Sequence, residues 1–383
     1  MYRHGGLPRP ASRLAHRFAL TLAIASVFFA TRATAQDTPF RINEDAAAIP
    51  RGSVRVGVSA EFSYVDELRE SGGKRIPLGR RFGFDSTADN VVASATVATT
   101  RLPLSLAYGI TSWLSIGASA PLVRRRVELS LDTNLRQVSP PPSPQRTRLA
   151  DRSAVGSFTN TNIGDVDITA RISLFDSFRG KAPLRFRVAA EGGVRLGTGP
   201  SRSTSNQVDP GAGDGQNDIL AAAFVDAALG ARWSFTVAGS RTTQRPDRQT
   251  IVSSDSVYPS RRISTGVERD LGDMTSLMVT PRYRLTRYIE FAASVSHRSK
   301  TTDRYTGAVP AEGWGLSAPP TGAYSATYAA LGIVFSTLPN GHAIGPWPVD
   351  LFFEHNRIVH SSGATLPDVR VDRLGGRMYV KLF

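Results

Sequence analysis

Residues 53–64 read Ser-Val-Arg-Val-Gly-Val-Ser-Ala-Glu-Phe-Ser-Tyr, and this stretch decides the fold class. Every even position from Val54 to Tyr64 is apolar, and every odd position is polar or glycine. Strict alternation is typical of a β-strand with one apolar face. A tilted strand needs ~9–11 residues to cross a bilayer, and the run has that length. The stretch therefore predicts a strand with one face against lipid.

The same alternation returns along the rest of the chain. Clear repeats lie at 102–108, 114–120, 166–174, 184–196, 233–237, 289–295, 329–335 and 378–382, and weaker ones at 218–229, 274–285 and 349–359. Together they predict about twelve strands, an even number that returns both ends of the chain to the same side of a membrane. The predicted fold class is all-β, a transmembrane antiparallel up-and-down β-barrel.

The connections between these strands alternate in length. Short connections lie near 109–112, 176–183, 230–232 and 286–287, with a longer one at 336–348, and long polar connections lie near 66–90, 131–157, 198–216, 244–270 and 299–321. Outer-membrane barrels have tight inner turns and long outer loops, whereas a soluble β-sandwich has no reason to gather its long loops at one end. Aromatic residues at the short turns, among them Tyr108, Trp113 and Trp233, fit the girdle of such a barrel.

The N-terminus predicts export. Residues 1–17 carry four arginines and no acid, residues 18–30 are largely apolar, and Ala33-Thr34-Ala35 has the small-x-small pattern of a cleavage site. We therefore predict a signal peptide at 1–35, a short periplasmic segment at 36–52 and a barrel at 53–383, in the outer membrane of a Gram-negative cell. The 383-residue chain has no cysteine, which excludes a disulfide scaffold and a cysteine zinc site.

Several short stretches resemble one known family. Tyr108-Gly109-Ile110-Thr111, Ile163-Gly164-Asp165-Val166, Leu196-Gly197-Thr198-Gly199 and Tyr283-Arg284-Leu285-Thr286 occur in this order. They are similar to motifs of the MetA-pathway-of-phenol-degradation family of outer-membrane transporters. The resemblance implies an outer-membrane barrel with a transport role.

The C-terminus matches the wider class of exported barrels in part. The chain ends on Phe383, and a terminal aromatic residue implies recognition by the barrel assembly machinery. Lys381 departs from this pattern, because the class usually has an aromatic or apolar residue two positions before the end. The strand register near Gly375-Gly376 is therefore left open, and a β-bulge there is one alternative.

If the apolar positions face lipid, the alternate positions face the lumen. Basic residues outnumber acidic ones there, and the candidate lumen-lining residues are Arg55, Glu61, Asp165, Asp167, Arg171, Arg185, Arg187, Glu191, Arg195, Arg282, Arg284, Glu290, Arg373, Arg377 and Lys381. An electropositive lumen favours anionic or aromatic solutes, since arginine suits carboxylates. The alternative is that arginine–carboxylate pairs fill the interior of a plugged structural or envelope-anchoring barrel.

An enzyme is the third alternative. His297 and Ser299 lie two residues apart, as in outer-membrane phospholipases, and would act as base and nucleophile of a lipid hydrolase. His355 and His360 do not by themselves predict a metal site. The sequence shows no phosphate-binding glycine loop, so we predict neither a cofactor nor a catalytic function.

Partners follow from charge and location. Basic clusters at Lys74-Arg75, Arg80-Arg81, Arg124–Arg126, Arg146-Arg148, Arg261-Arg262 and Arg298-Lys300 lie where strands meet long connections. In an exported barrel they favour phosphates of outer-membrane lipid and lipopolysaccharide over nucleic acid. The leading hypothesis is an outer-membrane channel or transporter for small solutes.

Overall fold

The structure of the 383-residue chain is a computed structural model. The structure describes residues 41–42, 44–78, 91–133, 156–178, 180, 182–200, 212–254, 262–306, 322–338 and 348–382. The predicted signal peptide, Arg80-Arg81, Arg146-Arg148 and Phe383 lie outside these residues. Among the described residues, no helix has the length and apolar character needed to span a bilayer.

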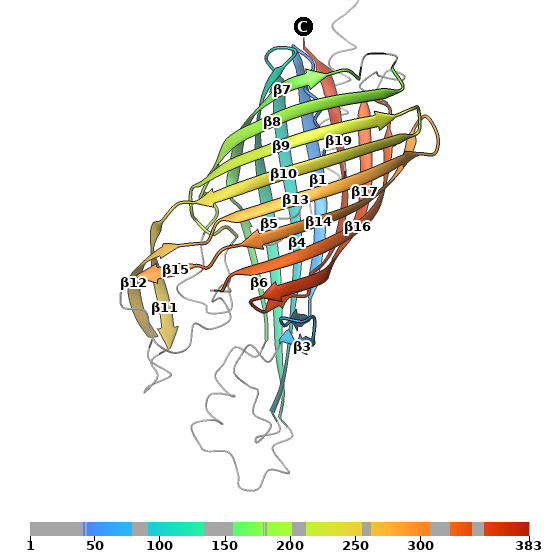
Figure 1. The fold of residues 1–383 in the computed structure, drawn as a ribbon. Coiled ribbons are helices and arrows are strands. Elements are labelled where there is room, and N and C mark those ends of the chain that lie inside the picture. Colours follow the sequence, from blue (N-terminus) through green and yellow to red (C-terminus); the bar gives the residue numbers. More distant parts are fainter. Residues whose placement is uncertain are drawn as a thin grey trace, which may run out of the picture. The chain divides into compact units, whose positions relative to one another are not determined.

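Antiparallel strands pair in a closed ring that forms a barrel (Figure 1). The wall strands are β1 (Ser53–Val65), β4 (Val91–Gly109), β5 (Leu114–Thr133), β6 (Gly156–Ile163), β7 (Val166–Asp176), β8 (Leu184–Leu196), β9 (Asp218–Leu229), β10 (Trp233–Gln244), β13 (Met274–Arg284), β14 (Ile289–Lys300), β16 (Tyr324–Ser336), β17 (Val349–Gly363) and β19 (Arg370–Lys381). β6 and β7 both pair with β5 and share one place in the wall. The wall therefore has twelve positions, as predicted, and the pairing of β4 with β5 completes the ring.

Alternate side chains of each strand face opposite sides of this wall. In β1, Phe62 and Tyr64 are exposed on the outer side, whereas Ser59 and Glu61 are buried on the inner side. The Ala-rich strand β9, one of the weaker repeats in the sequence, buries Phe224 and exposes Val225. Because a closed sheet satisfies all backbone hydrogen bonds between its strands, it suits a medium that offers none.

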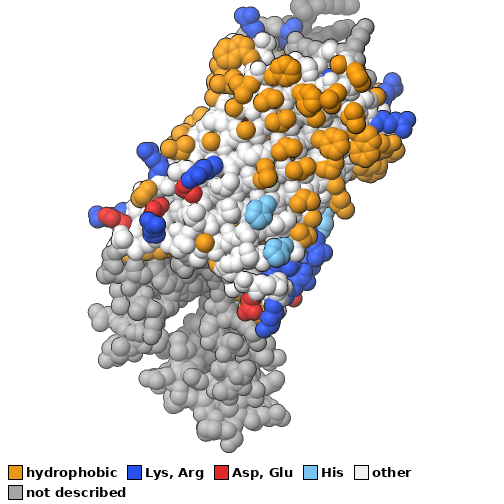
Figure 2. All heavy atoms as spheres, in the orientation of Figure 1, with side chains coloured by type: hydrophobic (Ala, Val, Ile, Leu, Met, Phe, Trp, Pro, Cys, Tyr) orange, Lys and Arg blue, Asp and Glu red, His pale blue; other side chains and the backbone are white. Residues whose placement is uncertain are grey.

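The outer side carries an apolar belt. Figure 2 shows hydrophobic side chains spread over the strands of the barrel. We call the following exposed outward residues the apolar belt: Val56, Phe62, Leu104, Leu106, Ile116, Ile168, Ile172, Phe186, Val194, Ile219, Val225, Val237, Val279, Phe291, Val295, Leu331, Ile333, Phe353, Leu374 and Val380. A surface of this kind belongs to a transmembrane barrel, whose lipid-facing side is apolar.

The inner side is charged, and the strand register pairs its charges. Arg171 lies directly opposite Glu191, and Arg373 lies directly opposite Glu354. Each pair forms an ion pair, at 2.8 Å between Arg171 Nε and Glu191 Oε2 and at 2.9 Å between Arg373 Nη1 and Glu354 Oε1. The same holds for these directly opposed pairs: Arg195 with Asp167, Arg284 with Glu290, and Arg377 with Asp350. Because a slip of one residue would turn these charges toward lipid, the ion pairs fix the register.

Two of the short connections use the same turn. Thr111 Oγ1 accepts hydrogen bonds from the backbone N–H groups of Trp113 and Leu114. Thr286 Oγ1 does the same for the two residues at the same spacing, Tyr288 and Ile289. A threonine hydroxyl at this place replaces a missing backbone acceptor and so allows a tight turn.

The long connections contain strands that the sequence analysis did not predict. β2 (Glu67–Arg69), β3 (Arg75–Pro77) and β18 (Leu366–Pro367) form one small sheet. β11 (Asp247–Ser254), β12 (Arg262–Asp270) and β15 (Arg304–Thr306) form another, seen in Figure 1 at the end of the barrel away from the C-terminus. The polarity of these segments hid them, because short strands outside the belt need no apolar alternation.

The structure answers the question of register near Gly375-Gly376. β19 pairs with β1 without interruption from Ser53 opposite Lys381 to Tyr64 opposite Arg370. No bulge occurs at the two glycines, and the register shifts in the described wall lie at Thr327/Tyr328 and Ser173/Phe175 instead. A Cβ at Gly375 would lie 2.5 Å from Ser59 Cβ, so this glycine is needed for close packing of the wall.

A charge placed on the apolar belt should destabilise the barrel according to its depth. Val225 lies at the middle of β9 and faces outward. Val225→Arg should cost about 2–4 kcal/mol of the free energy of unfolding from lipid bilayers, because arginine at mid-depth must be desolvated. Ser299→Arg, near the end of β14, is the control and should cost at most about 1 kcal/mol. Equal costs in denaturant titrations would contradict the membrane placement.

The buried Glu354–Arg373 pair should matter far more than an exposed one. Both side chains are fully buried, whereas Arg248 and Glu268 form an exposed pair at 3.1 Å. Glu354→Gln should cost about 3 kcal/mol because it removes the nearer of the two carboxylates that contact the buried guanidinium of Arg373. Glu268→Gln should cost less than about 1 kcal/mol. Unfolding midpoints of both variants check this, and a Glu354→Gln protein as stable as the wild type would refute it.

Candidate functional site

The interior of the barrel holds a stretch of the chain that precedes the first strand. We call residues 41–42 and 44–49 the N-terminal segment. Ile42 is fully buried against inward side chains of three strands, including Ala292, Val334 and Phe352. Ala46 is buried in a second cluster with Phe224 and other inward residues of β8, β9, β10 and β13. Part of the segment that the sequence predicts as periplasmic, residues 36–52, therefore lies against inward side chains of the barrel wall.

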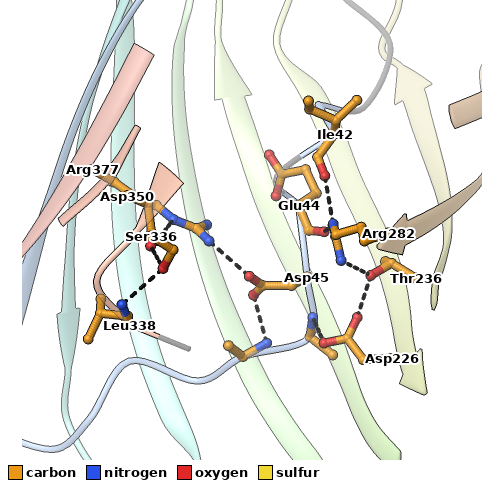
Figure 3. A network of polar contacts seen from close by, with 12 residues as sticks. Ile42, Glu44, Asp45, Asp226, Thr236, Arg282, Ser336, Leu338, Asp350 and Arg377 are labelled. Atoms are coloured by element: carbon orange, nitrogen blue, oxygen red, sulfur yellow. Dashed lines mark hydrogen bonds and ion pairs between the residues drawn. The ribbon is translucent and has the colours of Figure 1, made fainter. Parts of the chain in front are cut away.

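Charged groups of the wall bind the backbone of this segment (Figure 3). Arg282 donates from Nε and Nη2 to the carbonyl oxygen of Ile42, at 3.1 and 2.7 Å, and from Nη2 to that of Glu44. Glu354 Oε2 and Asp226 Oδ2 accept the N–H groups of Ile42 and Ala46, each at 3.0 Å. Hydrogen bonds to charged groups are about twice as strong as those between neutral groups. The segment is thus held by wall side chains on both its donors and its acceptors.

Asp45 adds an ion pair to the hydrogen bonds that hold the segment. Arg377 Nη2 lies 2.9 Å from Asp45 Oδ2, and its Nε lies 2.7 Å from Asp350. Arg171 Nη1 donates to the Asp45 carbonyl oxygen at 2.8 Å. One guanidinium therefore joins the wall strand β17 to the segment, as Figure 3 shows. The segment is part of the same charge network as the wall.

A cavity of about 340 Å³ remains beside the N-terminal segment. Its lining extends from Ser115, next to a short turn, to Ser276 and Arg298, near the far ends of their strands. Its charged lining residues include Arg41, Glu44, Arg55, Arg101, Asp167, Arg171, Glu191, Arg195, Arg298 and Arg377. Leu220, Phe224 and Phe352 supply apolar lining. The cavity thus combines an excess of guanidinium groups with an apolar wall.

Arg55 is the charged lining residue best placed to meet a solute. It is partly exposed, and no residue in the described part of the chain forms a hydrogen bond or ion pair with it. Glu61, by contrast, is buried and lies near Arg41, Arg101 and Arg373. The predicted residues Asp167, Arg171, Glu191 and Arg195 line the cavity as paired charges.

Other predicted lumen residues support the wall near its ends. Arg187 stacks over the ring of Phe178 at 4.1 Å and lies 3.6 Å from Asp226. Arg185 donates to the Gly230 carbonyl oxygen in a short turn. Arg284 and Glu290 pair close to another turn, and Lys381 is exposed at the end of β19. None of these lines the cavity.

Asp165 anchors a long connection. Placed between β6 and β7, it accepts hydrogen bonds from the backbone N–H groups of Gly199 and Asp214, at 2.9 and 3.2 Å. A Cβ on Gly213 would lie 2.3 Å from Asp165 Oδ1, which explains the glycine there. Burial raises the pKa of Asp165 to about 6, and the nearby Asp214 carboxylate adds to the rise. Asp165 therefore holds loop backbone at the end of the barrel wall.

Five acids that join the N-terminal segment to the wall were not predicted from the sequence: Glu44 and Asp45 of the segment, and Asp226, Asp350 and Glu354 of the wall. A signal existed in β17, where Asp350, Phe352 and Glu354 alternate with Leu351 and Phe353. The two acids of the segment gave no periodic signal at all.

The residues of the hydrolase alternative face outward and do not form a dyad. His297 Nδ1 lies 3.1 Å from Thr327 Oγ1, and no hydrogen bond joins the ring to Ser299. Both side chains are exposed on β14. In the described part of the chain, no group of histidine and acidic residues is arranged to hold a metal ion.

Comparison with known proteins supports the fold. No protein-family model matches the sequence, and no curated protein matches it. Among solved structures, the COG4313 outer membrane channel from Pseudomonas putida F1 is similar, with a TM-score of 0.54 and 14% identity over 90% of this chain and 100% of that chain.

The toluene transporter TbuX of Ralstonia pickettii is less similar, with a TM-score of 0.35 and 12% identity over 91% of this chain and 95% of that chain. The CymD monoaromatic hydrocarbon channel has a TM-score of 0.34 and 12% identity over 86% of this chain and 88% of that chain. The fold of this chain is that of an outer-membrane β-barrel.

Proposed function

We propose that this protein is an outer-membrane channel or transporter for small amphipathic anions, such as aromatic or acyl carboxylates. The observation that carries the proposal is the cavity beside the N-terminal segment, with guanidinium groups and apolar side chains in one lining. Its volume of about 340 Å³ lies at the small end of small-molecule sites. The proposed solutes are therefore small.

The chemistry of the lining favours a carboxylate head and an apolar body. Arg55 has no counter-ion within the described chain and is free to bind an anion, and a guanidinium matches the two oxygens of a carboxylate. Phe224 and Leu220 offer contact for an apolar body. The fold shared with the COG4313 channel and the MetA-pathway resemblance support transport.

A plugged structural barrel is the second candidate, and the N-terminal segment favours it. Wall residues bind this segment through at least three arginines, so much of the lumen is filled. The two candidates differ in one measurable property. A channel passes ions or solutes when folded in a bilayer, and a plugged barrel does not.

Removing the unpaired charge should change ion selectivity. Arg55→Gln should lower the ratio of anion to cation permeability about tenfold, because a unit charge ~6 Å from the path in a water-like medium contributes about 0.7 kcal/mol, or about threefold, with opposite sign for anions and cations. Reversal potentials in planar bilayers under a salt gradient measure this ratio. Arg357→Gln removes an equal charge from the outer surface and is the control. An unchanged permeability ratio in Arg55→Gln would show that ions do not pass close to Arg55, and this result would contradict the proposed transport path.

Deleting the N-terminal segment should open the lumen. A variant lacking residues 41–49 keeps every wall strand, and its inward arginines would be solvated by water in place of the segment. We expect single-channel conductance several-fold above that of the wild type, since the segment occupies the path. If neither protein conducts although both are folded, the channel proposal fails and the structural barrel gains support.

A further inference from the structure

Two arginines lie directly opposite each other on the outer surface of the barrel. Arg357 of β17 and Arg370 of β19 are partners in the strand register, and both side chains are exposed. Their positions belong to the outward face, because the inward positions of these strands hold the buried Glu354 and Arg373. Like charges directly opposite in a sheet destabilise it.

No carboxylate of the described chain compensates this pair. Asp372 is the nearest acid on the same face of β19, two residues from Arg370. Its carboxylate is 2.7 Å from the ring of His355, the residue that faces it across the strands. No ion pair or hydrogen bond joins Arg357 or Arg370 to any described residue. The pair therefore has room and charge for an external anion.

The position of the pair shows where such an anion comes from. Along β17, Phe353 of the apolar belt lies four residues before Arg357, and along β19, Leu374 lies four residues after Arg370. Tyr64 of β1 is the other register partner of Arg370 and is exposed on the same face. Figure 2 shows histidine and basic side chains gathered at the lower border of the hydrophobic surface. Tyrosine is enriched where hydrocarbon meets headgroups.

We propose that Arg357 and Arg370 bind the phosphate of a lipid whose acyl chains lie on the apolar belt, and that this lipid is the lipid A part of lipopolysaccharide. The pair lies toward the end of the barrel that carries the long connections, and this end faces the outer leaflet in barrels of this type. Two guanidinium groups side by side match a phosphate, which accepts paired hydrogen bonds. Phe353 and Leu374 receive the chains. This site is separate from the lumen and does not depend on transport.

Lipid titration of the folded wild-type protein in detergent tests the site. Native mass spectrometry would measure binding of diphosphoryl lipid A, dephosphorylated lipid A and inorganic phosphate. We expect Arg357→Gln/Arg370→Gln to weaken binding of diphosphoryl lipid A about thirtyfold, since each basic residue at a lipid surface contributes about fivefold. Arg357→Lys/Arg370→Lys keeps the charge and should retain most of the affinity. Dephosphorylated lipid A should bind the wild type weakly.

The control double variant is Arg232→Gln/Arg287→Gln, which removes the same charge from exposed short connections at the other mouth. It should bind diphosphoryl lipid A like the wild type. An equal loss in the control would show general electrostatic attraction and overturn the site. Unchanged affinity in Arg357→Gln/Arg370→Gln would overturn it as well. If millimolar inorganic phosphate displaces the lipid, the arginine pair binds free phosphate, and the proposal of a lipid site is overturned.

Discussion

Buried guanidinium groups are the constraint on which the interior depends. An arginine that faces the barrel axis loses water and must find acceptors, or it destabilises the fold by several kcal/mol. The wall supplies carboxylates directly opposite most of these arginines, but Arg282 finds its acceptors on the backbone of the N-terminal segment and on Thr236. Inward basic residues outnumber inward acidic ones, and the backbone carbonyl groups of the N-terminal segment supply some of the missing hydrogen-bond acceptors. The segment belongs to the fold for this electrostatic reason.

The two faces of the wall impose different rules on the same strands. Outward positions need only be apolar, and Val, Leu, Ile and Phe all occur there, so the alternation is easy to see in the sequence. Inward positions must match a partner on the next strand, so their chemistry depends on register. The Glu354–Arg373 and Arg171–Glu191 pairs show this dependence, since each joins residues that only the strand pairing brings together.

This difference explains how much the sequence could predict. Twelve wall positions, the bounds of β9 (Asp218–Leu229) and the outward face of β16 followed from period-two patterns, which act within one strand. The binding of Ile42 by Glu354 could not follow, because these residues are far apart in the chain and the segment around Ile42 has no periodicity. Asp165 had the charge of a lumen residue, yet its position between two strands directs it to loop backbone. The sequence pattern predicts the strands of the wall, whereas the contacts inside the barrel depend on which residues the fold brings together.

The cavity and the segment together decide what a solute has to displace. The cavity of about 340 Å³ lies beside the segment, so under the proposed transport function a solute of that size would pass Arg55 while Arg282 and Arg377 stay bound to the segment. A larger solute must free the segment and break several charge-assisted hydrogen bonds at once. Water that enters the vacated lumen would solvate the released arginines and offset part of this cost. If the barrel transports solutes as proposed, the free energy that holds the segment in the lumen would select solutes by size as much as the width of the wall does.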